Sequence, residues 1–213
     1  VTLAKTIKTA NEVANTSSWA WPKNLTWDNY LTVLTNPNAR FDLFFRNSLF
    51  VTVMATAGVL VTSALVAYAF SRIKFRGRDR LFILLLSTMM LPGIVTMIPT
   101  YVMYRYMGWI DTFYPLWVPA WFGGGAYNIF LLRQFFLGIP RELDEAAVLD
   151  GASHATIFWR IIVPNSGPAL ASVGIFSFIY SWRDFLGPLV FLNDPEKHTL
   201  ELGLRTYQSL QQE

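Results

Sequence analysis

Charged residues are scarce in this sequence and are absent from four long stretches. Only 15% of the 213 residues are Asp, Glu, Lys or Arg, whereas soluble domains carry about a quarter. The stretches without any charge are Ser48–Phe70, Leu81–Tyr104, Thr112–Leu132 and Ile161–Trp182. Each exceeds the roughly 20 residues that a helix needs to cross a bilayer. We therefore expect an all-α, polytopic membrane protein with four visible spans. A soluble bundle is disfavoured, because its outer helices would carry polar stripes.

The chain also lacks cysteine and the common signatures of catalysis. With no cysteine it can form neither a disulfide nor a thiolate metal site. It contains no GxxxxGK[ST] phosphate loop, no nucleotide-binding glycine fingerprint, no HExxH and no GxSxG. The net charge of +3 is spread between the apolar stretches, which argues against nucleic-acid binding. We expect this chain by itself to be no enzyme and to bind no cofactor or metal.

Basic residues gather between the first two apolar stretches. Segment Ser71–Arg80 holds five Lys or Arg and one Asp, and the positive-inside rule predicts that it is cytoplasmic. Alternation then predicts that loop 133–160 is also cytoplasmic and that residues 183–213 lie outside. Residues 1–46 form an extracytoplasmic segment, with a short helix expected over Trp27–Leu34, and residues 47–213 form the transmembrane domain.

Proline and polar residues mark the last apolar stretch. Pro164 and Pro168 predict a kinked helix, which membranes tolerate where neighbouring helices or cavity water satisfy the freed carbonyls. Three polar residues of this stretch, Asn165, Ser172 and Ser177, are candidates for a transport pathway. Hydrogen bonding between helices is the commoner role of such residues, and the sequence leaves both roles open.

A short acidic helix is expected between the third and fourth stretches. Glu142, Asp144 and Glu145 follow Pro140, where negative charge suits a helix N-terminus, and Gly151 suits a left-handed end. Helical spacing predicts one face that contains Glu145, Val148, Leu149 and Ala152. It predicts a second face that contains Leu143, Ala146, Ala147 and Asp150. Such a helix fits a groove on a soluble partner. A helix lying on lipid is the alternative, but it would be basic rather than acidic.

The spacing around this helix carries a family resemblance. Glu145-Ala146-Ala147, three residues, Gly151, nine residues and Ile161-x-Val163-Pro164 resemble the EAA loop of permease subunits in bacterial binding-protein-dependent ABC importers. Val163 replaces the usual leucine. Further matching pieces are Arg46-Asn47-Ser48-Leu49, Ala67-Tyr68-Ala69-Phe70, Leu91-Pro92, Ile98-Pro99, Phe135-Phe136, Ile139-Pro140 and Ser181-Trp182. The whole run is most similar to the carbohydrate-uptake branch, the maltose-permease-G-like subunits.

The resemblance implies the fold of a type I ABC importer, a kinked transmembrane bundle with six helices in the intact subunit. Neither the first nor the last of these is expected here, and Val1 suggests a trimmed chain. The implied partners are a second permease subunit, two copies of a cytoplasmic ATPase that uses ATP and Mg, and an extracytoplasmic solute-binding protein. The implied substrate is a sugar or oligosaccharide. The implied location is the plasma (inner) membrane of a prokaryote. The chain would cross this membrane several times and contact its lipid.

The resemblance also assigns roles within the loop. It implies that Glu145, Ala146, Ala147, Val148, Leu149 and Gly151 couple the chain to the ATPase. Glu145 would form a salt bridge, the alanines would allow close approach, and Gly151 would turn the chain into a second helix capped by Ser153. Asp144 lies on neither of the two helix faces, so we expect its replacement by alanine to have little effect on transport. The alternative is a secondary transporter or channel-type protein not driven by ATP, although ion coupling favours an ionisable residue inside a span, and the four stretches have none.

Overall fold

The computed structural model describes residues 40–210, with side chains through residue 206, and every regular element in this part is helical. The expected all-α class is therefore confirmed. The helix expected over Trp27–Leu34, with most of the segment 1–46, lies outside the described residues.

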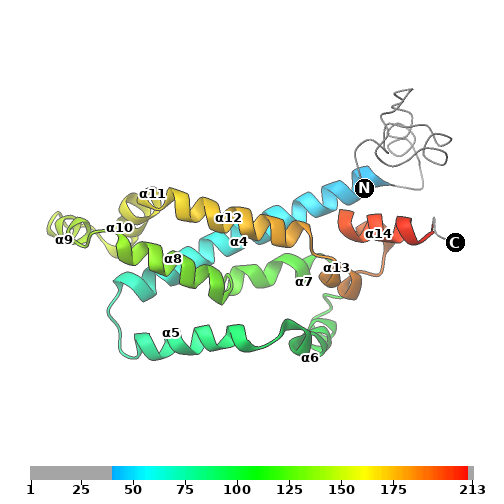
Figure 1. Ribbon diagram of the computed structural model, residues 1–213, viewed down its shortest axis with the longest axis horizontal. Helices are drawn as coiled ribbons and strands as arrows, with labels where there is room; N and C mark the ends of the chain where they lie inside the picture. The colour runs from blue at the N-terminus through cyan, green and yellow to red at the C-terminus, as the bar shows by residue number, and fades with distance from the viewer. Residues whose placement is uncertain (1–39, 211–213) are drawn as a thin grey trace, which may run out of the picture.

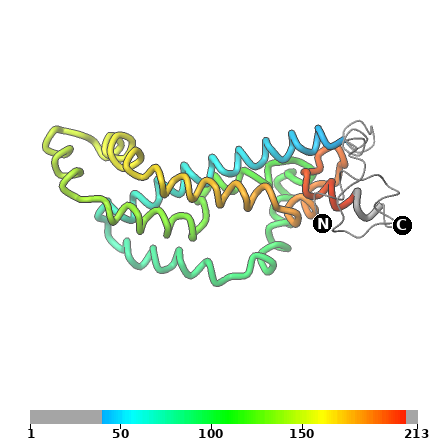
Figure 2. Tube along the Cα trace, turned by 45° about the horizontal axis from the view of Figure 1, so that its top comes forward, coloured from blue at the N-terminus to red at the C-terminus, as the bar shows by residue number. Residues whose placement is uncertain are grey.

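The central element is the long helix α4, Phe41–Arg72. Its 32 residues span about 48 Å at 1.5 Å per residue. Within the described part of the chain it is the one continuous helix that is long and apolar enough to cross a membrane. Helices α8 (Ala126–Gly138) and α12 (Gly167–Trp182) pack along it (Figures 1 and 2).

The second and fourth apolar stretches form bent pairs of helices. Helix α5 (Arg78–Ser87), with the 3-10 turn η1 (Thr88–Met90), meets α6 (Gly93–Tyr106) at 96°. Pro92 lies at this bend because proline disfavours helical backbone in the residue before it. The other pair bends by 79° between residues 154–165 and α12. Its first arm contains α10 (His154–Ile157), the π-helical η3 (Phe158–Ile162) and α11 (Val163–Asn165).

The third stretch is divided and does not count as a span by length and composition, so the described helices do not provide all four of the expected spans. It forms α7 (Tyr114–Trp117), the 3-10 turn η2 (Val118–Phe122) and then α8. The break is Gly123–Gly125, whose three φ angles are 141°, 60° and 85°, values that only glycine adopts readily. By length and composition, the described helices provide one span, or up to three if each bent pair counts as one.

Hydroxyl groups of α4 satisfy the backbone at this break. Ser63 Oγ donates to the Gly124 carbonyl over 3.1 Å, and Thr62 Oγ1 donates to the Ala120 carbonyl over 3.1 Å. Carbonyls without partners are costly where water is excluded. The polar residues of α4 therefore allow an irregular segment to lie against it.

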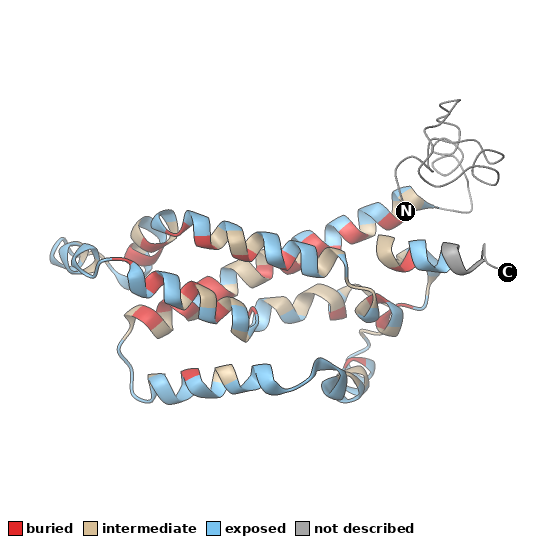
Figure 3. Cartoon of the chain, viewed as in Figure 1, coloured by how far each residue is buried: buried red, intermediate tan, exposed pale blue. Residues whose placement is uncertain are grey.

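The core lies where α4, α8 and the fourth stretch meet. Its most deeply buried residues are Ala67, Leu132, Phe136, Ile162 and Val173. Helix α5 joins this core through the ring of Phe82, which lies near those of Phe70 and Phe130 and under the guanidinium of Arg133. The rest of α5 is mostly exposed although apolar (Figure 3), a surface suited to lipid or to another membrane helix.

The connections separate into two ends of the elongated bundle. One end holds the α4–α5 connection and helix α9 (Glu142–Leu149). The other holds the start of α4 together with α13 (Leu186–Phe191), η4 (Pro195–Lys197) and α14 (Leu200–Leu210) (Figure 1). Segments 71–80 and 133–160 thus lie at the same end, as the alternation of spans requires.

Asp111 joins two connecting segments at the end of the bundle opposite α9. One is the segment between α6 and α7 that contains Asp111 itself, and the other is the segment that follows α13. Its Oδ1 accepts hydrogen bonds from the backbone N–H groups of Asn193 and Asp194, both 3.0 Å long, and its Oδ2 lies 2.8 Å from Lys197 Nζ. The hydrogen bond from Lys197, followed by those from the backbone, lowers the pKa of Asp111 to about 2. The residue itself has a φ of 61°, an unusual value for a side chain other than glycine.

Gly124→Ala is expected to destabilise the bundle. A Cβ atom at this position would lie 2.9 Å from the Ser63 backbone nitrogen and closer still to Ser63 Oγ, and φ is already left-handed. We expect a loss of at least about 2 kcal/mol from strain and displacement, measured as a lower thermal unfolding midpoint in detergent. The control is Gly167→Ala, whose Cβ meets nothing within 4 Å. Equal midpoints for the two variants would contradict this account of the break.

Asp111→Asn tests the tie between the two connections. Because the pKa of Asp111 is lower in the folded chain than its ordinary value of 3.8, its contribution is present above about pH 4 and is lost as the pH falls towards 2. The variant should lose about 1–2 kcal/mol at neutral pH, and the loss should become much smaller as the pH falls through about 2. The control is Asp79→Asn, since Asp79 pairs with its neighbour Arg78 and is 74% exposed. A cost for Asp111→Asn that does not change with pH would refute the assignment.

Candidate functional site

Helix α9 projects from one end of the bundle. It begins at Glu142 with three acidic residues in its first turn and ends at Leu149. Gly151 follows with a φ of 80°, so the predicted left-handed turn is present. Pro140 precedes the helix, and α9 has eight residues. Ser153 caps α10 as expected, because its Oγ accepts the Thr156 N–H over 3.2 Å.

The outward face of α9 is acidic and apolar. Leu149 is 88% exposed and Val148 56%, and Glu145 and Ala146 are also exposed. Ala147 is half-buried and packs against the core of the chain itself. The resemblance gives the two alanines the same role, but their surroundings differ. Ala146 is exposed, whereas Ala147 packs against the bundle.

The inward face of α9 is anchored by a buried ion pair. Arg72, the last residue of α4, lies 3.0 Å from Asp144 through Nη1 and Oδ2, and their side chains are only 4% and 18% exposed. The same guanidinium donates through Nη2 to the carbonyls of Phe136 and Ile139, at the end of α8. The expectation that Asp144 matters little is therefore wrong. The helical spacing of α9 could not predict this contact, because Arg72 belongs to another helix.

A cleft of about 440 Å³ opens beside this pair. It is lined by Tyr68, Arg72, Asp144, Glu145, Val148, Leu149, His154 and Ile157. Tyr68 Oη lies 3.4 Å from His154 Nδ1, which gives α10 a polar contact with α4. Among the described atoms, Asp144 Oδ1 and Arg72 Nε are buried without a hydrogen-bond partner. Two of the residues that line the cleft thus each have one buried polar atom without a partner.

A second cavity, of about 580 Å³, lies inside the bundle beside the glycine break. Its lining comes from α4, α7, η2, α8, α12 and the segments next to them, and consists of Ala55, Val59, Leu116, Pro119, Ala120, Gly124, Gly125, Tyr127, Asn128, Phe176, Ser177, Tyr180, Ser181 and Asp184. Ser177 Oγ is buried and has no hydrogen-bond partner among the described residues. Burial raises the pKa of the Asp184 carboxyl. The hydrogen bonds from the backbone of Gly187 and Leu186 lower it, but their effect is smaller.

Only one of the three candidate pathway residues lines this cavity. Ser177 does, whereas the exposed Asn165 and the half-buried Ser172 donate to carbonyls of their own helical segments. The Asn165 bond to the Ile161 carbonyl is 2.7 Å long, and the Ser172 bond to the Pro168 carbonyl is 2.9 Å. Asp184 lines the cavity as well.

The bend before α12 falls between the two prolines of the fourth stretch. Pro164 lies in the first turn of α11 and Pro168 in the first turn of α12, with the buried Ser166 between them. Ser166 Oγ donates to the Ile162 carbonyl over 2.6 Å, one of the carbonyls near the bend. Within residues 40–210 there is no group of three His, Cys, Asp or Glu residues that could hold a metal ion.

Comparison with known proteins relates this architecture to one family. Residues 59–213 match the family described as "Binding-protein-dependent transport system inner membrane component". The chain is 34% identical, over 97% of its length and 74% of the relative, to a putative ABC transporter permease protein of Caldicellulosiruptor. It is 32% identical to the trehalose/maltose transport system permease protein MalG of Thermococcus litoralis, over 87% of this chain and 66% of that one.

A solved structure has the same fold. It is a chain of a bacterial ABC transporter involved in the import of the acidic polysaccharide alginate, superposed with a TM-score of 0.84 at 27% identity, over 95% of this chain and 70% of that one. The chain spans about two thirds to three quarters of the length of these proteins. The chain belongs to the family of inner membrane components of binding-protein-dependent transport systems.

Proposed function

We propose that this chain is the permease subunit of an ATP-driven importer for a sugar or oligosaccharide. Relatives with sugars in their names support the substrate class, among them the trehalose/maltose permease and an arabinooligosaccharide permease of Halalkalibacterium halodurans. The chain crosses the plasma membrane several times, with segments 71–80 and 133–160 in the cytoplasm and segments 1–46 and 183–213 outside. The partners are a second permease subunit, two ATPase subunits and an extracytoplasmic binding protein.

The observation that carries the proposal is the projecting helix α9. A short helix with an exposed carboxylate at Glu145 and exposed apolar groups at Val148 and Leu149 is suited to a groove on a soluble protein. The chain has no phosphate-binding loop of its own, so ATP and Mg bind to the partner that receives α9. Ala146 lies on the exposed side and allows close approach, while Ala147 holds α9 against the bundle.

Coupling follows two connections from α9 into the membrane. One is Arg72, which joins Asp144 to α4 and to the end of α8. The other continues through Gly151 and α10 to the bend between Pro164 and Pro168. Movement of α9 by the ATPase therefore reaches α4 and α12, and these helices both line the internal cavity. In this proposal Ser177 faces the translocation pathway, and Asn165 and Ser172 lie outside it.

Reconstitution tests the function. The chain, its permease partner, the ATPase and the binding protein are placed in vesicles, and uptake of a panel of labelled oligosaccharides is measured with ATP inside. The wild-type complex should accumulate at least one of them only when ATP and the binding protein are both present. Uptake that persists without ATP would favour a secondary transporter and overturn the proposal.

Glu145→Lys and Gly151→Val test the docking helix. Reversing a partly buried charge contact can cost several kcal/mol, and a β-branched residue at a φ of 80° costs about 1–2 kcal/mol. Both variants should reduce uptake at least tenfold, and Glu145→Lys should release the ATPase from tagged membranes. Asp79→Lys, a charge reversal at the same end but on α5, is the control. Wild-type uptake in both test variants would mean that α9 does not couple the subunits.

Arg72→Met and Asp144→Leu test the buried pair. Removing one partner leaves a buried charge without compensation and costs about 3–5 kcal/mol, so each single variant should have a much lower thermal midpoint. The double variant should be less destabilised than the sum of the two, because both charges are gone. Its uptake per ATP hydrolysed should remain low, since α9 is no longer tied to α4. If a stable double variant took up as much sugar per ATP hydrolysed as the wild type, the pair would have only a structural role.

A further inference from the structure

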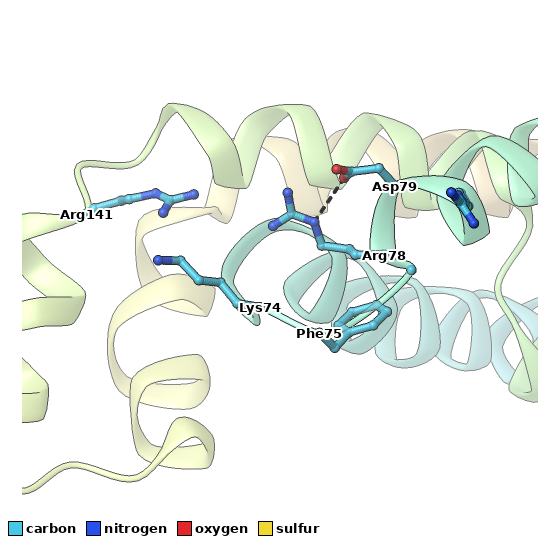
Figure 4. Close-up of a pocket in the computed structure, with 7 residues that line it drawn as sticks. Lys74, Phe75, Arg78, Asp79 and Arg141 are labelled. Carbon is cyan, nitrogen blue, oxygen red and sulfur yellow. Dashed lines mark hydrogen bonds and ion pairs between the residues drawn. The ribbon is translucent and has the colours of Figure 1, made fainter.

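Four cations from three segments converge at the end of the bundle that carries α9. Lys74 follows α4, Arg78 and Arg80 begin α5, and Arg141 immediately precedes α9. Together with Phe75, Gly77 and Asp79 they line an open cleft of about 540 Å³. The charged ends of Lys74, Arg78 and Arg141 point towards a shared space (Figure 4).

This cationic cleft has a large excess of positive charge. Its single carboxylate, Asp79, lies 3.1 Å from Arg78 Nε and is 74% exposed. Among the described residues, Lys74, Arg80 and Arg141 have no acidic partner within salt-bridge distance. Like charges repel when they are brought together, so an arrangement of this kind is favoured by an anion that lies between them.

The neighbouring apolar surface indicates where that anion comes from. On α5, Leu81, Ile83 and Leu84 are 49%, 67% and 63% exposed, and they begin one residue after Arg80. At 1.5 Å per residue, the cations of α5 therefore lie within about one helical turn of the apolar surface. On α8, Leu137 is exposed only four residues before Arg141. Cations next to an exposed apolar helix surface lie at the level of lipid headgroups.

We propose that Lys74, Arg78, Arg80 and Arg141 form a binding site for the phosphate of an anionic phospholipid, with the acyl chains along the exposed face of α5. Lysine and arginine donors suit phosphate oxygens, and basic pockets between membrane helices bind anionic headgroups in this way. Because Arg141 is the residue before α9, a bound headgroup contacts the start of the docking helix. The site extends beyond transport itself and does not depend on the substrate.

Lipid retention by the purified complex tests the site. The complex is incubated with vesicles of phosphatidylcholine containing phosphatidylglycerol and purified again, and the phosphatidylglycerol bound per complex is counted by mass spectrometry. The double variant Lys74→Gln/Arg141→Gln should weaken the apparent affinity for phosphatidylglycerol about 25-fold. This figure assumes that each cation near an anionic surface contributes a factor of roughly five. Arg76→Gln/Arg160→Gln removes the same charge from exposed residues outside the cleft and should stay within about twofold of wild type.

Each other outcome overturns the proposal. Equal losses in the two double variants would mean a general surface-charge effect. Release of the ATPase with unchanged phosphatidylglycerol binding would assign the cluster to the protein partner. Displacement of phosphatidylglycerol by an excess of inorganic phosphate would assign it to a soluble anion, since acyl chains along α5 should resist such competition. A wild-type complex that retains no phosphatidylglycerol would exclude the site, whether or not it transports a sugar.

Discussion

One buried guanidinium fixes the end of the bundle that carries α9. Arg72 is almost fully enclosed, and a buried charge is tolerated only when its hydrogen bonds and its charge are compensated. Its Nη1 and Nη2 groups are compensated by two carbonyls at the end of α8 and by the carboxylate of Asp144 on α9, while its Nε has no partner among the described residues. The directions of α4, α8 and α9 are therefore set by the donors of a single side chain. Helix α9, which buries little apolar surface, depends on this contact for its position.

The same physical requirement shapes the interrupted helices. Backbone that leaves the helical pattern in an apolar environment must find other partners for its carbonyls. Here the hydroxyl groups of α4 supply them at the glycine break, and Ser166 does so near the bend before α12. The breaks are therefore confined to places where a hydroxyl-bearing residue lies close by. The glycine break also borders the cavity of about 580 Å³ between α4, α8 and α12.

Much of this organisation could be predicted from the sequence. The uncharged stretches predict the helical class, and the acidic turn and Gly151 predict the limits of the short helix to within a few residues. The role of Asp144 could not be predicted, because its partner Arg72 is 72 positions away and a helical projection of α9 alone does not contain it. Hydropathy also counts Gly123–Gly125 as part of an apolar run, although their φ angles end the helix.

The pathway candidates show the same limit. Asn165, Ser172 and Ser177 are equivalent as polar residues in an apolar stretch, and only packing distinguishes them. Asn165 and Ser172 use their polar atoms on carbonyls one turn earlier in the chain, so they need no other partner. Ser177 Oγ has none within the described structure, and Ser177 lines the cavity. Such a difference depends on side-chain orientation and on neighbouring helices, which hydropathy does not encode.

Helix α4 is bonded to other elements at both of its ends. Near its start, Asn47 Nδ2 donates to the carbonyls of Glu196 and His198, and Ser48 Oγ accepts the Leu200 N–H over 2.7 Å. At its last residue, Arg72 binds α8 and α9. Since α4 is continuous over its 32 residues, a rotation about its long axis at one end is transmitted to the other without loss at a hinge. Torsion of α4 thus links the end of the bundle that carries α9 to the connecting segments at the opposite end, some 36 Å away along the helix.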